Sequence, residues 1–432
     1  MSAAVSDNLL ERRQRLIGRH APLFYDEPLE IVRGEGVWLF DKAGRQYLDA
    51  YNNVVQCGHC HPHIVAALTH QAGQLNTHTR YLHSGIVDYV ERLTALFDAP
   101  LDMAMLTCSG SEANELALRM ARYTTGHQGI IVTDCTYHGN TEAVAELGTG
   151  LMPEAQHVER VAAIPVPDSF RLPSGATPDT LTHYYLQKVH DAIAELQARG
   201  MGVAGLLVCP IFANEGLVEP PPGFMEQAVA AVRKAGGLYI ADEVQGGFGR
   251  TGDHWWSHQA YPVTPDIVTL GKPMGNGHPM AGVIASREHI EPFSEWAMYF
   301  NTFAGNPVSC AVGAAVLDVI EDEHLMANAV AMGAYIREGL ESLQQRFPVI
   351  GDVRQKGLFF AVELVAPGEN QAPNATLTHD MVNRMCRKGV LISRIGVHNN
   401  ILKMRPPLPI QQNHADLLLN QLESCFTELA GT

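Results

Sequence analysis

The sequence predicts an α/β protein with a large, mostly parallel sheet domain followed by a smaller α+β domain. Short apolar runs typical of strands alternate with helical stretches between residues 101 and 284, and this alternation favours a parallel central sheet. After residue 312 the apolar period becomes helical, and short strands follow it, which indicates the second domain. A chain of 432 residues with 46% hydrophobic residues can bury both cores.

In the large domain we expect strands at residues 103–106, 129–133, 205–211, 237–241, 266–270 and 281–284. A helix follows the first strand up to residue 123, and another covers residues 182–199. Residues 151–182 are rich in Pro, Gly, Ser and Thr, and they predict a surface excursion. The ligand of such a domain lies beyond the carboxyl ends of its strands.

The remaining elements define the domain limits. Residues 36–40 and 47–50, with a turn at 41–44, predict a hairpin that joins the small domain. Strands at 359–364, 390–393 and 401–404 and a last helix at 414–429 complete that domain. We therefore expect an N-terminal segment at 1–60, a large domain at 61–315 and a small domain at 316–432.

Composition narrows the function classes. The formal net charge is -16, and no Lys/Arg run compensates it, so a nucleic acid would be repelled. The first twenty residues lack the apolar centre of a secretory signal, and no apolar stretch is long enough to span a membrane. Several of the eight cysteines lie in apolar runs typical of reduced core thiols. We expect a cytoplasmic protein with neither nucleic acid nor membrane as a partner.

Two strand ends carry the residues that are most informative about chemistry. Asp242 ends the apolar run at 238–241, and Lys272 follows the run at 266–270. A lysine that forms a Schiff base and a carboxylate that holds a pyridinium nitrogen are what pyridoxal phosphate requires. The pair therefore predicts this cofactor, with both residues catalytic.

A second signal is the junction between the first strand and its helix, where Ser109, Gly110 and Ser111 stand. Free backbone N–H groups at such a junction can bind a phosphate, although an ordinary helix cap has the same composition. Tyr137 and His138 follow another strand, and an aromatic ring there can stack on a flat ligand or simply pack in a turn.

Two other motifs compete with this interpretation. Residues 247–252 read G-F-G-R-T-G and follow a strand, but no small-residue helix comes next, so a tight turn is favoured over a dinucleotide site. Residues 57–63 read C-G-H-C-H-P-H, which suggests zinc. No second Cys/His cluster accompanies it, so a structural role is favoured and no metal is expected.

Taken together, these motifs resemble the class III, or ω-type, pyridoxal-phosphate aminotransferases over nearly the whole chain. The resemblance implies fold type I and a homodimer. It also implies that Lys272 bonds to the cofactor, Asp242 holds the ring nitrogen, and Tyr137 and Val244 enclose the ring. Gln245 would contact the ring hydroxyl with His138 close by. The phosphate would be bound by Ser109, Gly110, Ser111 and, from the neighbouring subunit, Thr302.

Two departures from the family pattern bear on the reaction. Many members use a glutamate and a C-terminal arginine to grip a substrate carboxylate, and here those positions hold Cys209 and Lys403. A lysine is a point charge and does not replace the arginine fork, although Arg405 could. Residues 47–54, 58–62 and 75–83 look most like the ethanolamine-phosphate phospho-lyase branch of the family.

The resemblance therefore implies a lyase that eliminates phosphate from O-phosphoethanolamine or a related phosphorylated amine. We expect the substrate phosphate to be bound by Arg80, Lys403 and Arg405, with Asn53 as a polar helper. An ω-transaminase that moves an amino group to a keto acid such as pyruvate would share every cofactor residue. A non-catalytic binding or zinc protein is the third class and would lack the cofactor's visible absorption.

Overall fold

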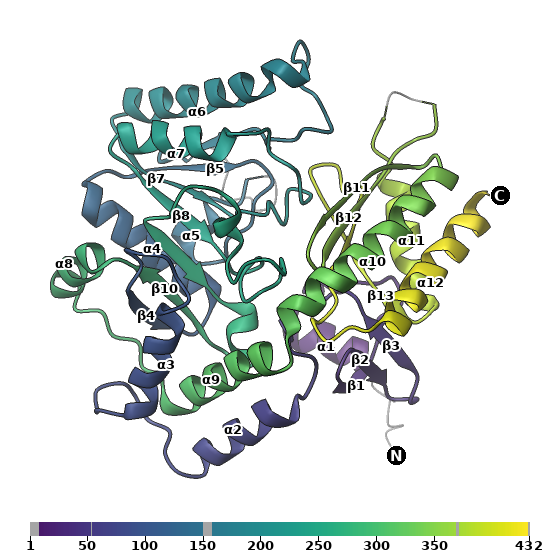
Figure 1. The fold of residues 1–432 in the computed structure, drawn as a ribbon, viewed down its shortest axis with the longest axis horizontal. Coiled ribbons are helices and arrows are strands. Elements are labelled where there is room, and N and C mark those ends of the chain that lie inside the picture. Colours follow the sequence, from purple (N-terminus) through teal and green to yellow (C-terminus); the bar gives the residue numbers. More distant parts are fainter. Residues whose placement is uncertain (1–7, 53, 150–157, 369–370, 431–432) are drawn as a thin grey trace, which may run out of the picture.

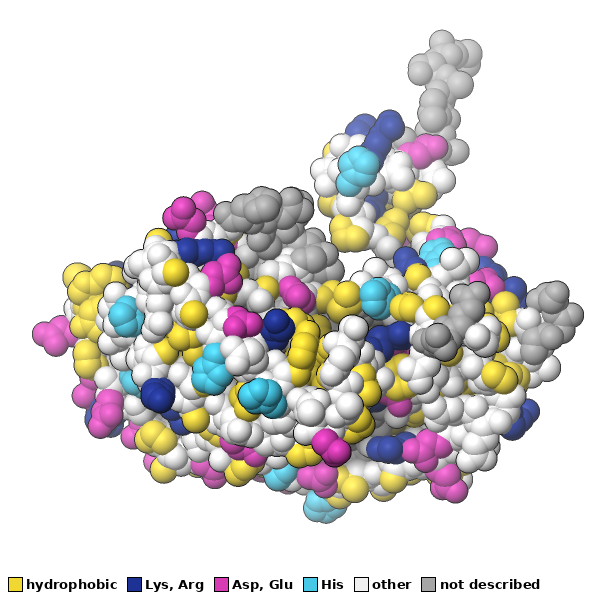
Figure 2. All heavy atoms as spheres, turned by 90° about the horizontal axis from the view of Figure 1, so that it is seen from above, with side chains coloured by type: hydrophobic (Ala, Val, Ile, Leu, Met, Phe, Trp, Pro, Cys, Tyr) yellow, Lys and Arg dark blue, Asp and Glu magenta, His cyan; other side chains and the backbone are white. Residues whose placement is uncertain are grey.

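The chain folds into two lobes that pack side by side (Figure 1). A computed structural model describes residues 8–52, 54–149, 158–368 and 371–430. None of the helices in these ranges is long and apolar enough to cross a membrane. On the face seen in Figure 2, Lys and Arg side chains are scattered among acidic ones and form no continuous patch.

The large lobe is built on a seven-stranded sheet in the order β4-β10-β9-β8-β7-β5-β6. Only β10 runs antiparallel to its neighbours β4 and β9, so the sheet is mostly parallel, as predicted. The strands are β4 (Met103–Thr107), β5 (Gly129–Thr133), β6 (Val161–Ile164), β7 (Val203–Val208), β8 (Leu238–Asp242), β9 (Ile267–Leu270) and β10 (Ala281–Ala285).

Helices cover both faces of this sheet, because β5, β7, β8 and β10 are apolar on both sides. Helices α4 (Gly110–Thr125) and α8 (Arg287–Ala297) share one core with it, and α6 (Leu181–Ala198) and α7 (Phe224–Lys234) pack on the other face. The lobe also contains α2 (Pro62–Ala72), α3 (Ser84–Thr94), α5 (Glu142–Ala145) and the 3-10 helices η3 (Ser257–Ala260) and η4 (Lys272–Gly275), and η2 (Pro178–Thr180) precedes α6.

The small lobe contains two four-stranded sheets. One is β11-β12-β15-β14, and the other joins the N-terminal strands to β13 in the order β1-β2-β3-β13. Helix α9 (Pro307–Asp322) leads into this lobe, so the expected limit between residues 315 and 316 falls within a helix. The other elements are α1 (Leu9–Ile17), β1 (Ile31–Glu35), β2 (Trp38–Asp41), β3 (Gln46–Asp49), α10 (Leu325–Arg346), β11 (Ile350–Lys356), β12 (Phe359–Leu364), α11 (Ala375–Arg387), β13 (Val390–Leu391), β14 (Ser393–Ile395), β15 (Ile401–Met404) and α12 (Gln412–Ala430).

Three expectations about elements were wrong. The predicted excursion at 151–182 contains β6, an edge strand of four residues that is too short to stand out between turn residues. The strand expected to reach residue 211 ends at Val208, because the Phe212 N–H turns back to the carbonyl of Cys209. The single strand expected at 390–393 is two strands, since the chain passes from one sheet to the other at Ile392.

Candidate active site

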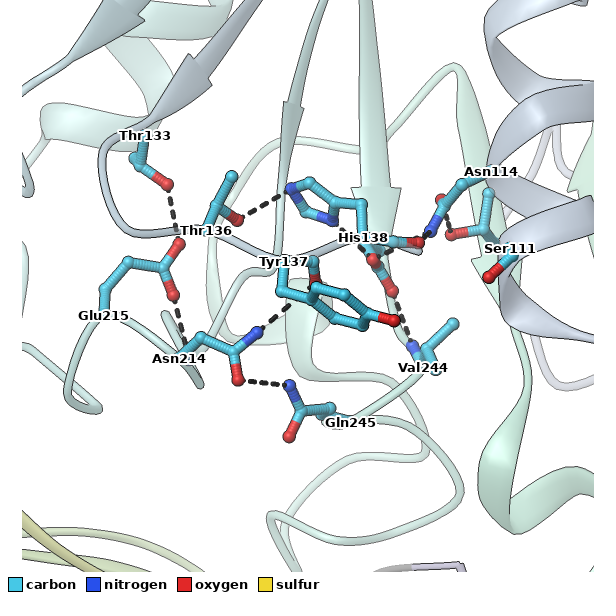
Figure 3. Close-up of polar contacts among 12 residues, drawn as sticks. Ser111, Asn114, Thr133, Thr136, Tyr137, His138, Asn214, Glu215, Val244 and Gln245 are labelled. Atoms are coloured by element: carbon cyan, nitrogen blue, oxygen red, sulfur yellow. Dashed lines mark hydrogen bonds and ion pairs between the residues drawn. The ribbon is translucent and has the colours of Figure 1, made fainter. Parts of the chain in front are cut away.

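The strand ends predicted to carry chemistry meet at one edge of the large sheet. Asp242 is the last residue of β8, and Lys272 follows β9 by one glycine. Parallel strands end on the same edge, so Asp242 and Lys272 face the same space as the loops that follow β4 and β5. Figure 3 shows Tyr137, His138, Asn114 and Ser111 converging there.

Asp242 is a buried carboxylate with three hydrogen-bond partners. His138 Nδ1 lies 2.6 Å from Asp242 Oδ2, Asn114 Nδ2 donates to the same oxygen at 3.0 Å, and the Val244 N–H donates to Oδ1 at 2.9 Å. Burial alone would raise the pKa of Asp242, but the hydrogen bond and charge of His138 and the charge of Lys272 outweigh it and lower the pKa. The carboxylate therefore stays ionised.

Lys272 begins the 3-10 helix η4 with a φ of 36°, a left-handed backbone conformation that costs a non-glycine residue about 1–2 kcal/mol. Removal from water lowers the pKa of its ammonium group, and the charge of Arg405 adds to this, while Asp242 opposes it. The lowered pKa increases the share of neutral, nucleophilic amine near pH 7.

The junction of β4 and α4 is a capped helix N-terminus. Ser109 Oγ accepts from the Glu112 N–H at 3.2 Å, and Glu112 Oε2 accepts from the Cys108 and Ser109 N–H groups. The cap leaves the N–H groups of Gly110 and Ser111 without an acceptor in the helix. The segment is therefore a helix cap, and it also keeps two backbone donors available to an anion.

Close packing keeps side chains out of this cup. A Cβ on Gly110 would lie 3.1 Å from a methyl group of Val244, and one on Gly271 would lie 3.3 Å from the Gly110 backbone. Gly139 has a φ of 146°, and a Cβ there would lie 2.6 Å from Ser111 Oγ. A ligand at this helix N-terminus would therefore contact the backbone of these glycines directly.

The residues expected around the ring lie nearby but have other partners as well. Tyr137 is 40% exposed and Val244 is buried. The ring nitrogens of His138 contact Asp242 and Thr136. Gln245 donates to Asn214 Oδ1 at 3.1 Å.

Lys403 and Arg405 form a buried pair of cations on β15 and the residue just after it. Only 3% of Lys403 and 4% of Arg405 is exposed. Lys403 Nζ lies 3.2 Å and Arg405 Nη1 2.5 Å from Gln245 Oε1, which accepts from both. They line a cavity of about 400 Å³ together with Tyr51 and Asn214.

No carboxylate in the described part of the chain forms an ion pair with either of these cations, and Arg405 Nε is buried without any hydrogen-bond partner. Cys209, at the position of the family's glutamate, packs with Ile211, Phe359 and Ile401 in an apolar cluster. Burial, and then the charges of Arg405 and Lys272, lower the pKa of Lys403 well below its ordinary value. An anion entering the cavity would relieve this repulsion.

Of the other predicted residues, Arg80 and Asn53 were expected to bind the substrate, and Thr302 was expected to bind the cofactor phosphate of the neighbouring subunit. Arg80 is exposed between α2 and α3, with its guanidinium 3.8 Å above the ring of Phe300, and it does not line the cavity of Lys403 and Arg405. Thr302 lies exposed in the loop that follows α8. Asn53 lies outside the described residues.

Sequence reasoning missed the polar residues that organise the site. Asn114 joins Asp242 to Thr269, and the buried carboxylate of Glu215 accepts from Thr133 Oγ1 at 2.6 Å and from the Asn214 N–H at 3.0 Å (Figure 3). Asn214 in turn contacts Gln245 and Lys403.

The two competing motifs have local partners. In residues 57–63, His59, His61 and His63 each contact a different carboxylate, those of Asp49, Glu323 and Asp318 respectively. Residues 247–252 form a turn, as expected, and no helix follows it directly.

The family model of the class-III aminotransferases matches residues 24–426. The chain belongs to the class-III aminotransferase family. An alanine–glyoxylate aminotransferase 2-like protein of Drosophila melanogaster is 39% identical, covering 97% of this chain and 86% of its own length. The ethanolamine-phosphate phospho-lyase homolog 1 of Caenorhabditis elegans is 34% identical, covering 98% of this chain and 93% of its own length. The solved structure of a phospholyase from Arthrobacter in complex with phosphoethanolamine is 48% identical, covers 97% of this chain and 99% of that chain, and has a TM-score of 0.94.

These matches confirm the predicted class-III family, fold type I and the cofactor, which is pyridoxal 5'-phosphate. The site fits this group. It offers a buried, ionised carboxylate, a lysine with a lowered pKa, and a helix N-terminus whose glycines leave room for a phosphate beside the backbone.

Proposed function

We propose that this class-III enzyme is a phospho-lyase that eliminates phosphate from O-phosphoethanolamine or a related phosphorylated amine. The products are an aldehyde, ammonia and inorganic phosphate. The observation that carries the proposal is the buried pair Lys403 and Arg405, which lies beside Gln245 and has no ion-paired carboxylate in the described chain. A dianionic phosphate matches two such cations better than a single carboxylate does.

The energetics support this choice of substrate. Burying a charge without a partner costs several kcal/mol. Burial and the charge of Arg405 lower the pKa of Lys403 here, and an anion beside both side chains would favour the charged amine. The unbonded Arg405 Nε adds an unused donor. A phosphate would accept from both side chains in a cavity of about 400 Å³, which has room for a small amine phosphate. The 48% identity with an Arthrobacter phospholyase solved with phosphoethanolamine and the 34% identity with a phospho-lyase homolog point the same way.

We propose the following contacts with the cofactor. Lys272 would bond to the cofactor aldehyde, Asp242 would hold its ring nitrogen, and Tyr137 and Val244 would flank the ring. Gly110 and Ser111 would donate backbone N–H groups to its phosphate, with Ser109 closing the cap. Gln245 is the candidate for the ring hydroxyl. His138 would act through Asp242 as a positioning residue.

The bound cofactor supplies an electron sink for the carbon that carries the substrate nitrogen. Lys272, as a neutral amine, would take the proton from this carbon. Asp242 would hold a proton on the ring nitrogen. Lys403 and Arg405 stabilise the charge that develops on the leaving phosphate as the carbon–oxygen bond breaks. Hydrolysis of the two-carbon remainder gives acetaldehyde and ammonia.

The enzyme is proposed to work as a homodimer. Thr302 would bind the cofactor phosphate of the partner subunit. Arg80 stacks on Phe300, two residues before Thr302, so the two loops form one surface. We therefore assign Arg80 to the partner's substrate phosphate, which explains why it does not line the cavity of its own chain. Asn53 remains a proposed polar helper.

The second candidate function is ω-transamination to a keto acid such as pyruvate. The 39% identity with an alanine–glyoxylate aminotransferase 2-like protein favours it, and Arg405 could replace the missing carboxylate clamp. Phosphate release from phosphoethanolamine, measured with and without pyruvate, separates the two. We expect phosphate and acetaldehyde in equal amounts without pyruvate. Release that depends strictly on pyruvate, with phosphoethanolamine untouched in its absence, would instead assign the transaminase.

A further inference from the structure

Arg250, in the turn at 247–252, is completely buried and forms no ion pair with a carboxylate of the described chain. Its guanidinium donates to the carbonyl oxygens of Leu358 at 3.1 Å and Pro406 at 2.5 Å, and to Gln56 Oε1 at 3.3 Å. Burial, and then the charge of Arg405, lower its pKa to about 9, so it is still charged at neutral pH. One side chain therefore joins a turn of the large lobe to three distant segments.

Two of these segments lead directly to the substrate cations. Pro406 follows Arg405 in the chain, so the bond to its carbonyl fixes the end of the strand that carries Arg405. Leu358 precedes Phe359, whose ring centroid lies 5.2 Å from Lys403 Nζ and 5.4 Å from Arg405 Cζ. Arg250 thus holds the backbone next to Arg405 and next to the ring that Arg405 and Lys403 share.

The third segment contains Gln56, which connects Arg250 to the turn that follows Gln245. Gln56 accepts from Arg250 and donates to the carbonyls of Gly247 and Phe248, just after Gln245. Leu358 also donates its N–H to the Arg250 carbonyl at 3.1 Å. Gln245 is the residue that accepts from both Lys403 and Arg405. The guanidinium of Arg250 therefore contacts the backbone next to the donors Lys403 and Arg405 directly, and it reaches the backbone that follows the acceptor Gln245 through Gln56.

We infer that Arg250 is a positioning residue for phosphate binding, which sets Arg405 and Phe359 in register with the Gln245 turn. A lysine carries its three donors on a single nitrogen, so in this place it would not span acceptors on three separate segments as the planar guanidinium does. A planar fork is needed because the acceptors belong to separate segments. The inference rests on the proposed phosphate site, and it gives the buried arginine of the G-F-G-R-T-G turn a role in substrate recognition.

The test compares holoenzymes of wild type, Arg250→Lys and Arg250→Met. Inorganic phosphate serves as the probe and is measured as a competitive inhibitor, beside the KM for phosphoethanolamine and the cofactor content of each variant. We expect the inhibition constant for phosphate and the KM for phosphoethanolamine to rise by about tenfold in Arg250→Lys and by more in Arg250→Met. The amount of cofactor bound per subunit should stay as in wild type. Gln56→Met, which removes one acceptor, should give a smaller rise and serves if Arg250→Met does not fold.

Arg354→Lys is the matched control. Arg354 is also a buried arginine, but it is ion-paired with Glu363 and Asp352 and is not bonded to the segments around Arg405. The Arg354→Lys variant should have lower thermal stability. Its inhibition constant for inorganic phosphate, measured on cofactor-loaded enzyme, should stay within about twofold of wild type. If Arg250→Lys behaves in the same way, or loses cofactor in parallel with phosphate affinity, the inference is overturned. If wild type itself neither releases nor binds phosphate, it is the proposed function that fails.

Discussion

His138 Nδ1 lies 2.6 Å from Asp242 Oδ2, and both groups are buried. The other ring nitrogen of His138 contacts Thr136 Oγ1 at 2.9 Å, so each nitrogen has a fixed partner. Burial of Asp242 favours the neutral acid, yet its pKa is lowered, chiefly because His138 counters that burial. The histidine therefore controls the charge that faces the cofactor ring.

His138→Phe should raise the pKa of Asp242 and move the acid limb of the activity profile to higher pH. The folded-state pKa is depressed, so its stabilising effect is present above the unfolded value of about 3.9 and is lost as pH falls through the folded pKa. Loss of one charged hydrogen bond should cost about 1.5–3 kcal/mol of stability at neutral pH. Rate and thermal-unfolding measurements from neutral pH down to below the unfolded value of about 3.9 test this, and an unshifted acid limb would contradict the proposed role of His138.

Lys272→Ala should abolish turnover and leave the fold intact, because Lys272 follows a strand end beside Asp242 and is proposed to bond to the aldehyde and take the proton. Circular dichroism checks the fold, and borohydride reduction followed by mass spectrometry checks the covalent link. Lys234→Ala, at the exposed end of α7, is the control and should behave as wild type. A Lys272→Ala enzyme that turns over and still becomes labelled would disprove the assignment.

Cofactor capture by the apo-enzyme should follow the ionisation of Lys272, whose pKa is lowered from 10.5. The rate of capture should rise with pH and level off below that value. Asp242 raises this pKa and Arg405 lowers it, so Asp242→Asn should move the midpoint down and Arg405→Met should move it up. Stopped-flow absorbance of added pyridoxal phosphate gives the midpoint in each variant. Shifts in the same direction would contradict the charge assignments.

Arg405→Met should weaken phosphoethanolamine by about tenfold to a few hundred-fold in KM, since one charged hydrogen bond is lost. Bound cofactor should not change, because we propose that its phosphate binds in the separate cup at Gly110 and Ser111. Arg346→Met removes an exposed arginine of the small lobe and is the control. Steady-state assays and cofactor absorbance measure both effects, and equal loss of substrate and cofactor would argue against separate phosphate sites.

Strand-end logic predicted where Asp242 and Lys272 lie, because the ends of parallel strands share an edge whatever the details of packing. It did not predict Asn114, Asn214 or Glu215, whose partners are distant in the chain and appear only in the folded site. The spacing of Lys403 and Arg405 did contain a usable signal, since residues two apart on a strand project to one side. Their shared contact with Gln245 needed the fold.

The missing carboxylate gate gives a direct test of reaction class. Cys209 and Phe359 belong to one buried apolar cluster, the centroid of the Phe359 ring lies 5.2 Å from Lys403 Nζ, and Cys209 is among the groups close enough to affect the pKa of Lys403. A glutamate introduced there would be buried beside Lys403 and would pair with it. Cys209→Glu should therefore lower the rate of phosphate release by about tenfold or more, because Lys403 would pair with the glutamate and bind the substrate phosphate less tightly.

The double variant Cys209→Glu with Lys403→Arg restores both residues of the family's gate. A fork that can pair with glutamate or grip a carboxylate should let the enzyme accept amino and keto acids. We expect amino transfer from alanine to glyoxylate to rise above the wild-type level while phosphate release stays low. Cys209→Ser adds no charge and should keep phosphate release within about threefold of wild type. If the double variant releases phosphate as fast as wild type and gains no transfer, positions 209 and 403 do not decide between elimination and transamination.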